Sequence, residues 1–305
     1  MTHDPLALTD AGMETVLLFK EGFELPCFAS FPLLGEERGR AALRRYFQPF
    51  LETSDEQGMP FVLDTATWRA NPDWGAQLGY DEDALAEVNR DAIAFARQIA
   101  GDRPEVTING VLGPRGDGYV VGERMSPDEA ASYHSWQIGV LHEAGAQRIT
   151  ALTLSHPDEA IGVVHAAADA GVPVVPAFTV ETDGRLPDGT PLADAIEQVD
   201  AETGSAAEFF MVNCAHPTHI AAGLEGGPAL RRIGGLRVNA SALSHAELDE
   251  AEELDEGDPV ALARDNASLR ELLPSVRLLG GCCGTDHRHV TQIAAAWQGE
   301  QSSSR

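Results

Sequence analysis

Residues 148–179 have the sequence RITALTLSHPDEAIGVVHAAADAGVPVVPAFT, which has the pattern of a strand, a helix and a second strand. Apolar and β-branched residues fill Arg148–Leu154 and Pro173–Thr179. The segment between them begins at His156-Pro157 and stops at Gly171, and proline just inside a helix with glycine just past its end marks both boundaries. Strands that alternate with helices of ten or more residues form parallel β/α units. This segment therefore predicts an α/β fold.

The same alternation recurs along the whole chain. Ser126, Pro127 and Glu129 form a capping-box pattern for a helix that runs to about Ala144. Further helices are expected to start at Asp81 and at Asp258-Pro259. The other candidate strands are Leu6–Asp10, Phe61–Thr65, Val106–Leu112, Phe209–Cys214, Leu236–Ala240 and Val276–Gly281. Eight such units predict a closed (β/α)8 TIM barrel.

Length and composition favour one barrel in a reducing compartment. A chain of 305 residues fits one such barrel, so we expect a single domain over residues 1–305, with a polar, disordered tail at 298–305. No run of about 18 apolar residues is present, which argues against a membrane span. Four cysteines and the lack of an apolar leader-like segment favour the cytoplasm. Homo-oligomerisation stays open.

The charge balance excludes two classes of partner. The chain has 48 acidic and 21 basic residues, a net charge of −27. Nucleic acid and anionic membranes both require positive patches, so neither is an expected partner. The acidity suits attraction of a cationic substrate or an acidic, soluble surface, and we favour the second interpretation.

Three cysteines are expected to meet at one rim of the barrel. Cys214 ends the sixth predicted strand, and Cys282 and Cys283 follow the eighth. Active sites of such barrels lie at the carboxyl ends of the strands. The adjacent pair is poorly placed for an ordinary disulfide with each other, whereas three thiolates with an open fourth position are typical of catalytic zinc. The sequence therefore predicts a Zn2+ site in which these three cysteines are the metal ligands and the catalytic centre.

Other ligands and another function remain as alternatives. Each of four nearby histidines, His216, His219, His287 and His289, can bind zinc, but their positions at helix starts favour capping or solvated roles. Cys27 is expected to be a buried small hydrophobe. A thiol redox protein would use the same three cysteines, although a Cys-x-x-Cys motif is more typical of that class.

Three segments carry a resemblance to a known family. Asn213-Cys214, the run GGCCGT at 280–285 and the run TDAGMET at 9–15 resemble the zinc-dependent homocysteine S-methyltransferases, relatives of betaine–homocysteine methyltransferase. The resemblance extends over about residues 5 to 297. It implies a methyltransferase that converts homocysteine to methionine. In chemical terms, a thiol bound to zinc loses its proton and stays nucleophilic at neutral pH, as methyl transfer requires.

The resemblance also implies where the substrates bind. Asp10 and the backbone N–H groups of Ala11 and Gly12 are expected to hold the amino-acid end of homocysteine. Thr65 and Asn213 are expected to line the same pocket. The methyl donor is expected to be a free small molecule, either an S-methylmethionine-like sulfonium or a betaine-like compound, because no cobalamin or folate domain is evident.

One position departs from the family pattern. Members of this family commonly carry a glutamate near the end of strand four, where it pairs with the substrate ammonium. The matching stretch here is ALTL at 151–154, with Leu152 in place of the acid. Loss of a charge-assisted hydrogen bond of about 1.5–3 kcal/mol is expected. The departure leaves two alternatives open: a methyltransferase for a different thiol, or a non-catalytic zinc-binding barrel.

Overall fold

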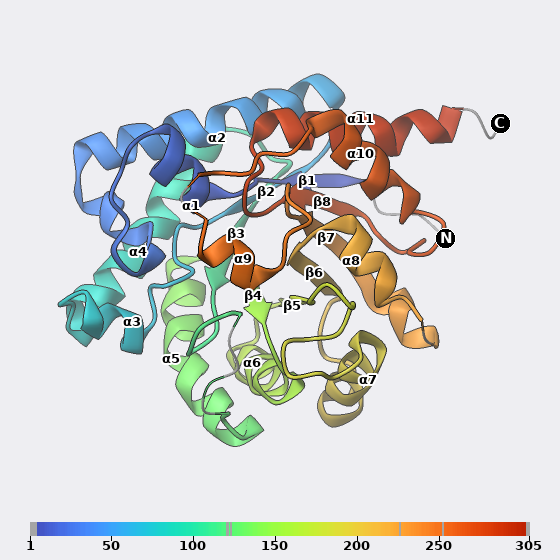
Figure 1. The fold of residues 1–305 in the computed structure, drawn as a ribbon. Coiled ribbons are helices and arrows are strands. Elements are labelled where there is room, and N and C mark those ends of the chain that lie inside the picture. The colour runs from blue at the N-terminus through green and yellow to red at the C-terminus, as the bar shows by residue number, and fades with distance from the viewer. Residues whose placement is uncertain (1–4, 120–121, 123, 226, 252, 303–305) are drawn as a thin grey trace.

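The computed structural model describes residues 5–302 except 120, 121, 123, 226 and 252. Eight parallel strands pair in chain order, and β8 pairs with β1 to close the barrel, as Figure 1 shows. The strands are β1 (Ala7–Thr9), β2 (Phe61–Asp64), β3 (Val106–Leu112), β4 (Arg148–Leu154), β5 (Val174–Phe178), β6 (Phe210–Ala215), β7 (Ile233–Val238) and β8 (Leu278–Gly281). The predicted (β/α)8 fold is confirmed.

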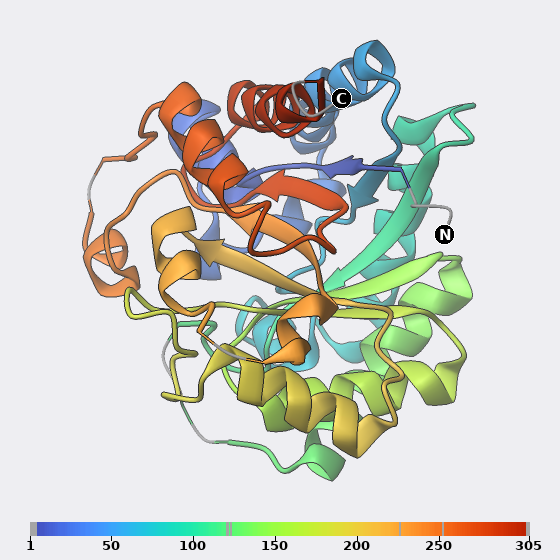
Figure 2. The ribbon, with the colours of Figure 1, turned by 90° about the vertical axis from the view of Figure 1, so that its right-hand side faces the viewer.

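Helices form a ring outside the strands (Figures 1 and 2). The capping box predicted at Ser126 and Glu129 is present, and Gly145 ends that helix in a left-handed conformation. The helices are α1 (Met13–Thr15), α2 (Glu37–Gln57), α3 (Pro72–Gln77), α4 (Glu82–Ala100), α5 (Pro127–Ala144), α6 (Pro157–Ala170), α7 (Leu192–Thr203), α8 (Pro217–Ala222), α9 (His245–Asp249), α10 (Pro259–Ser268) and α11 (His287–Ser302). Shorter turns are η1 (Val16–Lys20), η2 (Pro26–Phe28), η3 (Phe31–Gly35) and η4 (Pro228–Arg232). Across the described residues, no helix combines the length and apolarity that crossing a membrane requires.

Two predicted boundaries were wrong. Strand β7 begins at Ile233 rather than Leu236, because Gly234 and Gly235 lack the β-branched signal by which a strand is recognised. The predicted disordered tail from 298 is instead the last part of α11, which continues to Ser302. Gln298 and Glu300 are good helix formers, so the helix extends past Trp297. Residues 303–305 of the predicted tail lie outside the described residues.

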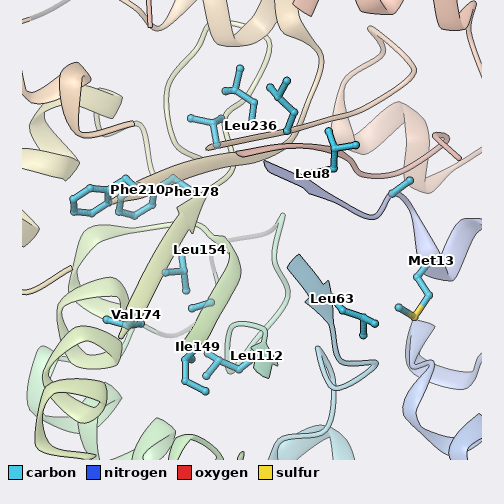
Figure 3. Close-up of a cluster of buried hydrophobic side chains, with 14 of the residues drawn as sticks. Leu8, Met13, Leu63, Leu112, Ile149, Leu154, Val174, Phe178, Phe210 and Leu236 are labelled. Atoms are coloured by element: carbon cyan, nitrogen blue, oxygen red, sulfur yellow. The ribbon is translucent and has the colours of Figure 1, made fainter. Parts of the chain in front are cut away.

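Apolar side chains occupy both faces of the barrel wall. Phe61 and Leu63 belong to the large core between strands and helices, whereas Val62 belongs to a smaller cluster inside the barrel. The alternation follows from the two-residue period of a strand. Figure 3 shows Leu63 and Leu112 among the side chains of the outer core. A strand buried on both faces explains the continuous apolar runs in the sequence.

Arg237 on β7 joins four strands at the carboxyl rim. Its guanidinium donates to Asp10 Oδ1 at 2.6 Å, to the Gly281 carbonyl at 3.0 Å and to the carboxylate of Asp64. These partners stand at the ends of β1, β8 and β2. Tyr46 of α2 donates to the second oxygen of Asp10 at 3.1 Å. The side chain of Arg237 is only 5% exposed, so this cluster is fully enclosed.

We expect Arg237→Met to lower the free energy of unfolding by about 3–5 kcal/mol, because it leaves two buried carboxylates without their cation. Denaturant-induced unfolding followed by circular dichroism measures this loss. Arg264→Met is the matched control, because Arg264 is 77% exposed and contacts only the neighbouring Asp265 in the part of the chain that the structure describes. Equal effects of the two substitutions would contradict a central role for Arg237.

Asp286 connects the start of α11 to the segment after β1. Its carboxylate contacts Lys20, Arg288 and His289 at 2.7, 2.8 and 3.0 Å. Burial alone would raise its pKa, but the hydrogen bonds from these three side chains hold the pKa of Asp286 well below its usual range. Because the pKa is lower in the folded than in the unfolded protein, the carboxylate stabilises the fold above about pH 4, and this contribution is lost as the pH falls.

We therefore expect wild-type stability to decrease on acidification below about pH 4 more steeply than that of Asp286→Asn. The variant should be less stable at neutral pH by about 1.5–3 kcal/mol, the usual contribution of hydrogen bonds to a charged group. Urea midpoints measured from pH 3 to pH 7 provide the test, with Asp265→Asn as a surface control. Parallel pH profiles for wild type and Asp286→Asn would show that the ion cluster does not contribute.

Candidate functional site

Three cysteine sulfurs converge at the carboxyl rim, as the strand ends predicted. Cys214 lies in β6, and Cys282 and Cys283 follow β8 directly. Their Sγ atoms all lie within 4.8 Å of one another, and together they form a group able to hold a metal ion. Cys214 is 2% exposed, whereas Cys282 and Cys283 are partly exposed, so the group is only partly covered.

Local backbone geometry turns the three thiols inward. Cys214 has a φ of 53° at a register shift between β6 and β7, so the strand is irregular at the cysteine. Gly284 has a φ of 80°, which permits the sharp turn after the double cysteine. A side chain at Gly12 would collide with the Cys282 carbonyl, so glycine lets β1 approach this turn. Thr285 Oγ1 closes the turn by donating to the same carbonyl at 2.6 Å.

Two of the thiols are oxidised in the structure. Cys214 and Cys282 form a disulfide, and Cys283 is a free thiol. Metal ligation requires thiolates, so a metal-bound form needs this disulfide to be reduced first. The donor set fits a soft metal: three sulfur atoms from two strand ends, with no carboxylate in the group.

The rival ligands do not join the group. Among the described residues, the three cysteines are the one cluster of metal-binding type. His216 caps α8, and His219 Nε2 contacts the Ala242 carbonyl at 3.0 Å. His289 contacts Asp286, and the ring of His287 lies edge-on to Phe50. His216 has the predicted capping role, and His219 and His287 are at least partly exposed as predicted, whereas His289 is fully buried and was wrongly expected to be capping or solvated.

Cys27 differs from its prediction. It was expected to be buried, but it is partly exposed and lines a cavity that Cys283 also lines, although it is not a member of the cysteine group. Cys27 and Phe28 both have positive φ in η2, so the backbone of this loop is irregular at the cysteine.

Tyr119 and His245 stand beside the cysteines, and sequence reasoning missed both. The Tyr119 hydroxyl lies 3.3 Å from Cys214 Sγ and 4.0 Å from Cys283 Sγ. Burial, with a smaller effect of Cys283, raises the pKa of Tyr119 well above its usual value, so the phenol stays protonated. The His245 ring packs on Tyr119 at 4.5 Å between centroids, and its Nε2 contacts the Cys214 carbonyl at 2.7 Å.

An inner pocket of about 60 Å³ opens onto the cysteine group. All five residues predicted to bind substrate line it, but their polar groups are already engaged. The Ala11 N–H donates to the Tyr46 hydroxyl at 3.0 Å, and the Gly12 N–H donates to the Thr285 carbonyl at 3.3 Å. Both N–H groups are hydrogen-bonded within the protein in this structure, so their use for a substrate carboxylate requires these bonds to be exchanged and stays a prediction.

Asp10, Thr65 and Asn213 line this pocket, and their side chains make hydrogen bonds to neighbouring residues. Burial and the nearby charge of Asp64 raise the pKa of Asp10 to about 7, although Arg237, which holds the carboxylate, lowers it. Thr65 Oγ1 accepts from the Val111 N–H at 3.0 Å. The Asn213 amide makes two hydrogen bonds to Thr153, at 2.8 and 2.9 Å.

Glu14 is the carboxylate of the inner pocket that no cation holds among the described residues. It accepts a hydrogen bond from Ser30 Oγ at 2.7 Å, and burial raises its pKa. In the sequence, the signal for Glu14 was its position inside the motif at 9–15, and no role was predicted for it. Leu152 lines the same pocket and is apolar, as the sequence indicated.

A larger outer cavity of about 480 Å³ adjoins the inner pocket. Both are lined by Thr15, Phe28, Trp68, Tyr119 and Cys283. The outer walls include aromatic and acidic residues, among them Phe19, Trp74, Asp117, Asp249, Glu253 and Asp255, and they contain one arginine, Arg69. The cysteine group therefore lies where a small and a large cavity meet.

Comparisons with known proteins agree with this geometry. The family model for homocysteine S-methyltransferase matches residues 7–297. The homocysteine S-methyltransferase YbgG of Bacillus subtilis is 27% identical over 230 residues, which cover 70% of this chain and 68% of that protein. Two structures of the homocysteine methyltransferase MmuM from Escherichia coli share the fold, each covering 96% of both chains. The metallated form has a TM-score of 0.72 at 20% identity, and the oxidised form 0.75 at 21%. The match over nearly the whole chain shows that this protein belongs to the homocysteine S-methyltransferase family.

Proposed function

We propose that the protein is a zinc-dependent S-methyltransferase that moves a methyl group from a small-molecule donor to homocysteine, giving methionine. The observation that carries this proposal is the meeting of three cysteine sulfurs within 4.8 Å at the junction of two cavities. Membership of the family supports homocysteine as the acceptor. Residues 1–305 would act as one barrel domain, with substrates as the partners.

Cys214, Cys282 and Cys283 would hold Zn2+ once the disulfide is reduced. Three thiolates suit zinc among the common metals, and three protein ligands leave a position for substrate. Bound zinc would keep the acceptor sulfur deprotonated and nucleophilic at neutral pH. A reducing compartment preserves such thiols, so we place the protein in the cytoplasm.

Glu14 would bind the ammonium group of homocysteine. The other two carboxylates of the inner pocket, Asp10 and Asp64, are both paired with Arg237. Glu14 retains its charge-pairing capacity and is oriented by Ser30. Leu152 provides an apolar wall that suits the methylene groups of the substrate. The acid that the family places on strand four would thus be replaced by one on α1.

The outer cavity would take the methyl donor. Aromatic faces and carboxylates both attract sulfonium and quaternary ammonium groups. Phe28, Trp68 and Tyr119 line both cavities, so a donor in the outer cavity can direct a methyl group toward the cysteines. The aromatic and acidic lining supports an S-methylmethionine-like or a betaine-like donor. Holding donor and acceptor in line would supply much of the rate.

We expect the reduced protein to bind about one zinc per chain. Cys282→Ser should lose most of the metal because one of three ligands is removed, while the circular dichroism spectrum stays unchanged. Metal content after dialysis against a weak chelator measures this. Cys27→Ser is the matched control, since Cys27 lies outside the group, and it should retain full zinc. Full retention by Cys282→Ser would refute the assignment of the ligands.

We expect Glu14→Gln to raise the KM for homocysteine about 10-fold or more, in line with the ~1.5–3 kcal/mol of a charge-assisted hydrogen bond. The KM for 4-mercaptobutyrate, which lacks the amino group, should not change. The double variant Glu14→Gln/Leu152→Glu should recover part of the loss by restoring an acid on β4.

Steady-state methyl transfer measures all three proteins with both thiols. An unchanged homocysteine KM in Glu14→Gln would remove Glu14 from ammonium binding. Preference of the wild type for 4-mercaptobutyrate over homocysteine would point to a less polar natural thiol, the alternative that Leu152 favours.

A further inference from the structure

Arg69 is held in a fixed orientation at the wall of the outer cavity. Its guanidinium carbon lies 4.1 Å from the ring centroid of Trp68 and 4.0 Å from that of Trp74. Nη1 donates to the Gly116 carbonyl at 2.9 Å. Two aromatic contacts and one hydrogen bond together fix the plane of the guanidinium, and the residue is only 5% exposed.

Within the described residues, this buried cation has no counter-ion. No carboxylate in the described part of the chain lies within ion-pair distance of Arg69, although Asp117 and Glu14 act on it from further away. Its Nε has no hydrogen-bond partner, and Trp74 Nε1 is a second donor of the same cavity without one. Burial without a partner is costly for a charged group, and it lowers the pKa of Arg69 from its usual value. Arginine nevertheless stays protonated.

A carboxylate is the ligand that satisfies such a site. A guanidinium presents its N–H groups in a planar fork that matches the two oxygens of a carboxylate. Stacking occupies the faces of the guanidinium, and its edge carries the N–H donors: Nη1 donates to the Gly116 carbonyl, and Nε is buried without a partner among the described residues. A buried guanidinium between two indole rings is therefore organised for an anion before any ligand arrives.

We propose that Arg69 anchors the carboxylate of the methyl donor in the outer cavity. This inference rests on the proposed function. It narrows the donor to an onium compound that also carries a carboxylate. Arg69 lines the outer cavity and not the inner pocket, so the anchor serves the donor rather than homocysteine. Phe28 and Tyr119, which line both cavities, leave the onium end a route toward the cysteines.

Measurements of donor binding test the proposed carboxylate anchor independently of catalytic turnover. The reduced, zinc-loaded protein is titrated with S-methyl-L-methionine and its carboxamide, and with glycine betaine and its carboxamide. Calorimetry gives the affinities, and fluorescence of the chain's 4 tryptophans follows the same titrations. We expect at least one carboxylate to bind 10-fold or more tightly than its amide. Arg69→Gln should abolish this preference, and Arg69→Lys should retain part of it.

Arg38→Gln is the matched control. It removes the same charge from another arginine stacked on an aromatic ring, Phe23, away from both cavities. It should preserve the preference. If the wild type shows no preference for either carboxylate, or if Arg69→Gln keeps the preference, the proposal is overturned.

Steady-state kinetics tests whether Arg69 acts on the donor alone. Arg69→Gln should raise the KM for the donor at least 10-fold and leave the KM for homocysteine within twofold. A shift only in the homocysteine KM, or equal losses for donors with and without a carboxylate, would overturn the proposal in favour of a role in acceptor binding or loop structure. Absence of methyl transfer in the wild type would refute the proposed function, whereas a carboxylate preference that depends on Arg69 would still establish the anchor.

Discussion

The buried ion cluster around Arg237 is the interaction on which the rest of the site depends. One guanidinium on β7 holds Asp10 and Asp64 at the ends of β1 and β2, and it also contacts the carbonyl of Gly281 at the end of β8. These strands carry the inner pocket and the turn into the double cysteine. The strands next to the closure between β8 and β1 are therefore fixed to one another by charge as well as by backbone pairing. Because water is excluded, the cluster is strong only while all three side chains are present.

The same cluster determines which polar groups remain for substrate. Asp10, Tyr46 and the backbone at 11 and 12 are all committed to closing the barrel. Glu14 takes no part in these hydrogen bonds, and neither does Arg69, which lines the outer cavity. The chain thus separates the charges that pair with one another around Arg237 from Glu14 in the inner pocket and Arg69 in the outer cavity, which keep their capacity for a ligand. A zwitterionic acceptor and a zwitterionic donor match that separation.

The cysteine group combines two chemical states in one place. Sulfurs close enough to share a metal are also close enough to form the disulfide between Cys214 and Cys282. Tyr119 covers the group from the loop after β3 and contributes a phenol that stays protonated. The reducing state of the surroundings therefore selects between a thiolate cluster and an oxidised pair, and only the first can hold a metal.

The sequence by itself determined the architecture and the meeting point of the cysteines. Strand and helix periods are local signals in the sequence. Because the carboxyl ends of parallel strands share one rim, the sequence alone predicted that Cys214, Cys282 and Cys283 lie close together. The predicted start of β7 and the predicted end of α11 were wrong because the local sequence signal was weak, at Gly234-Gly235 and beyond Gln298. Only the tertiary structure decided which polar groups are already hydrogen-bonded within the protein and which remain available to a ligand. Arg237, Tyr46, Tyr119 and Arg69 act through partners 36 to 227 residues away or through ring stacking, and no periodicity in the chain encodes such contacts. Hydrogen-bond capacity is limited, so a residue such as Asp10 or Ala11 can bind substrate only if the fold has not already used it, and that depends on the closed barrel.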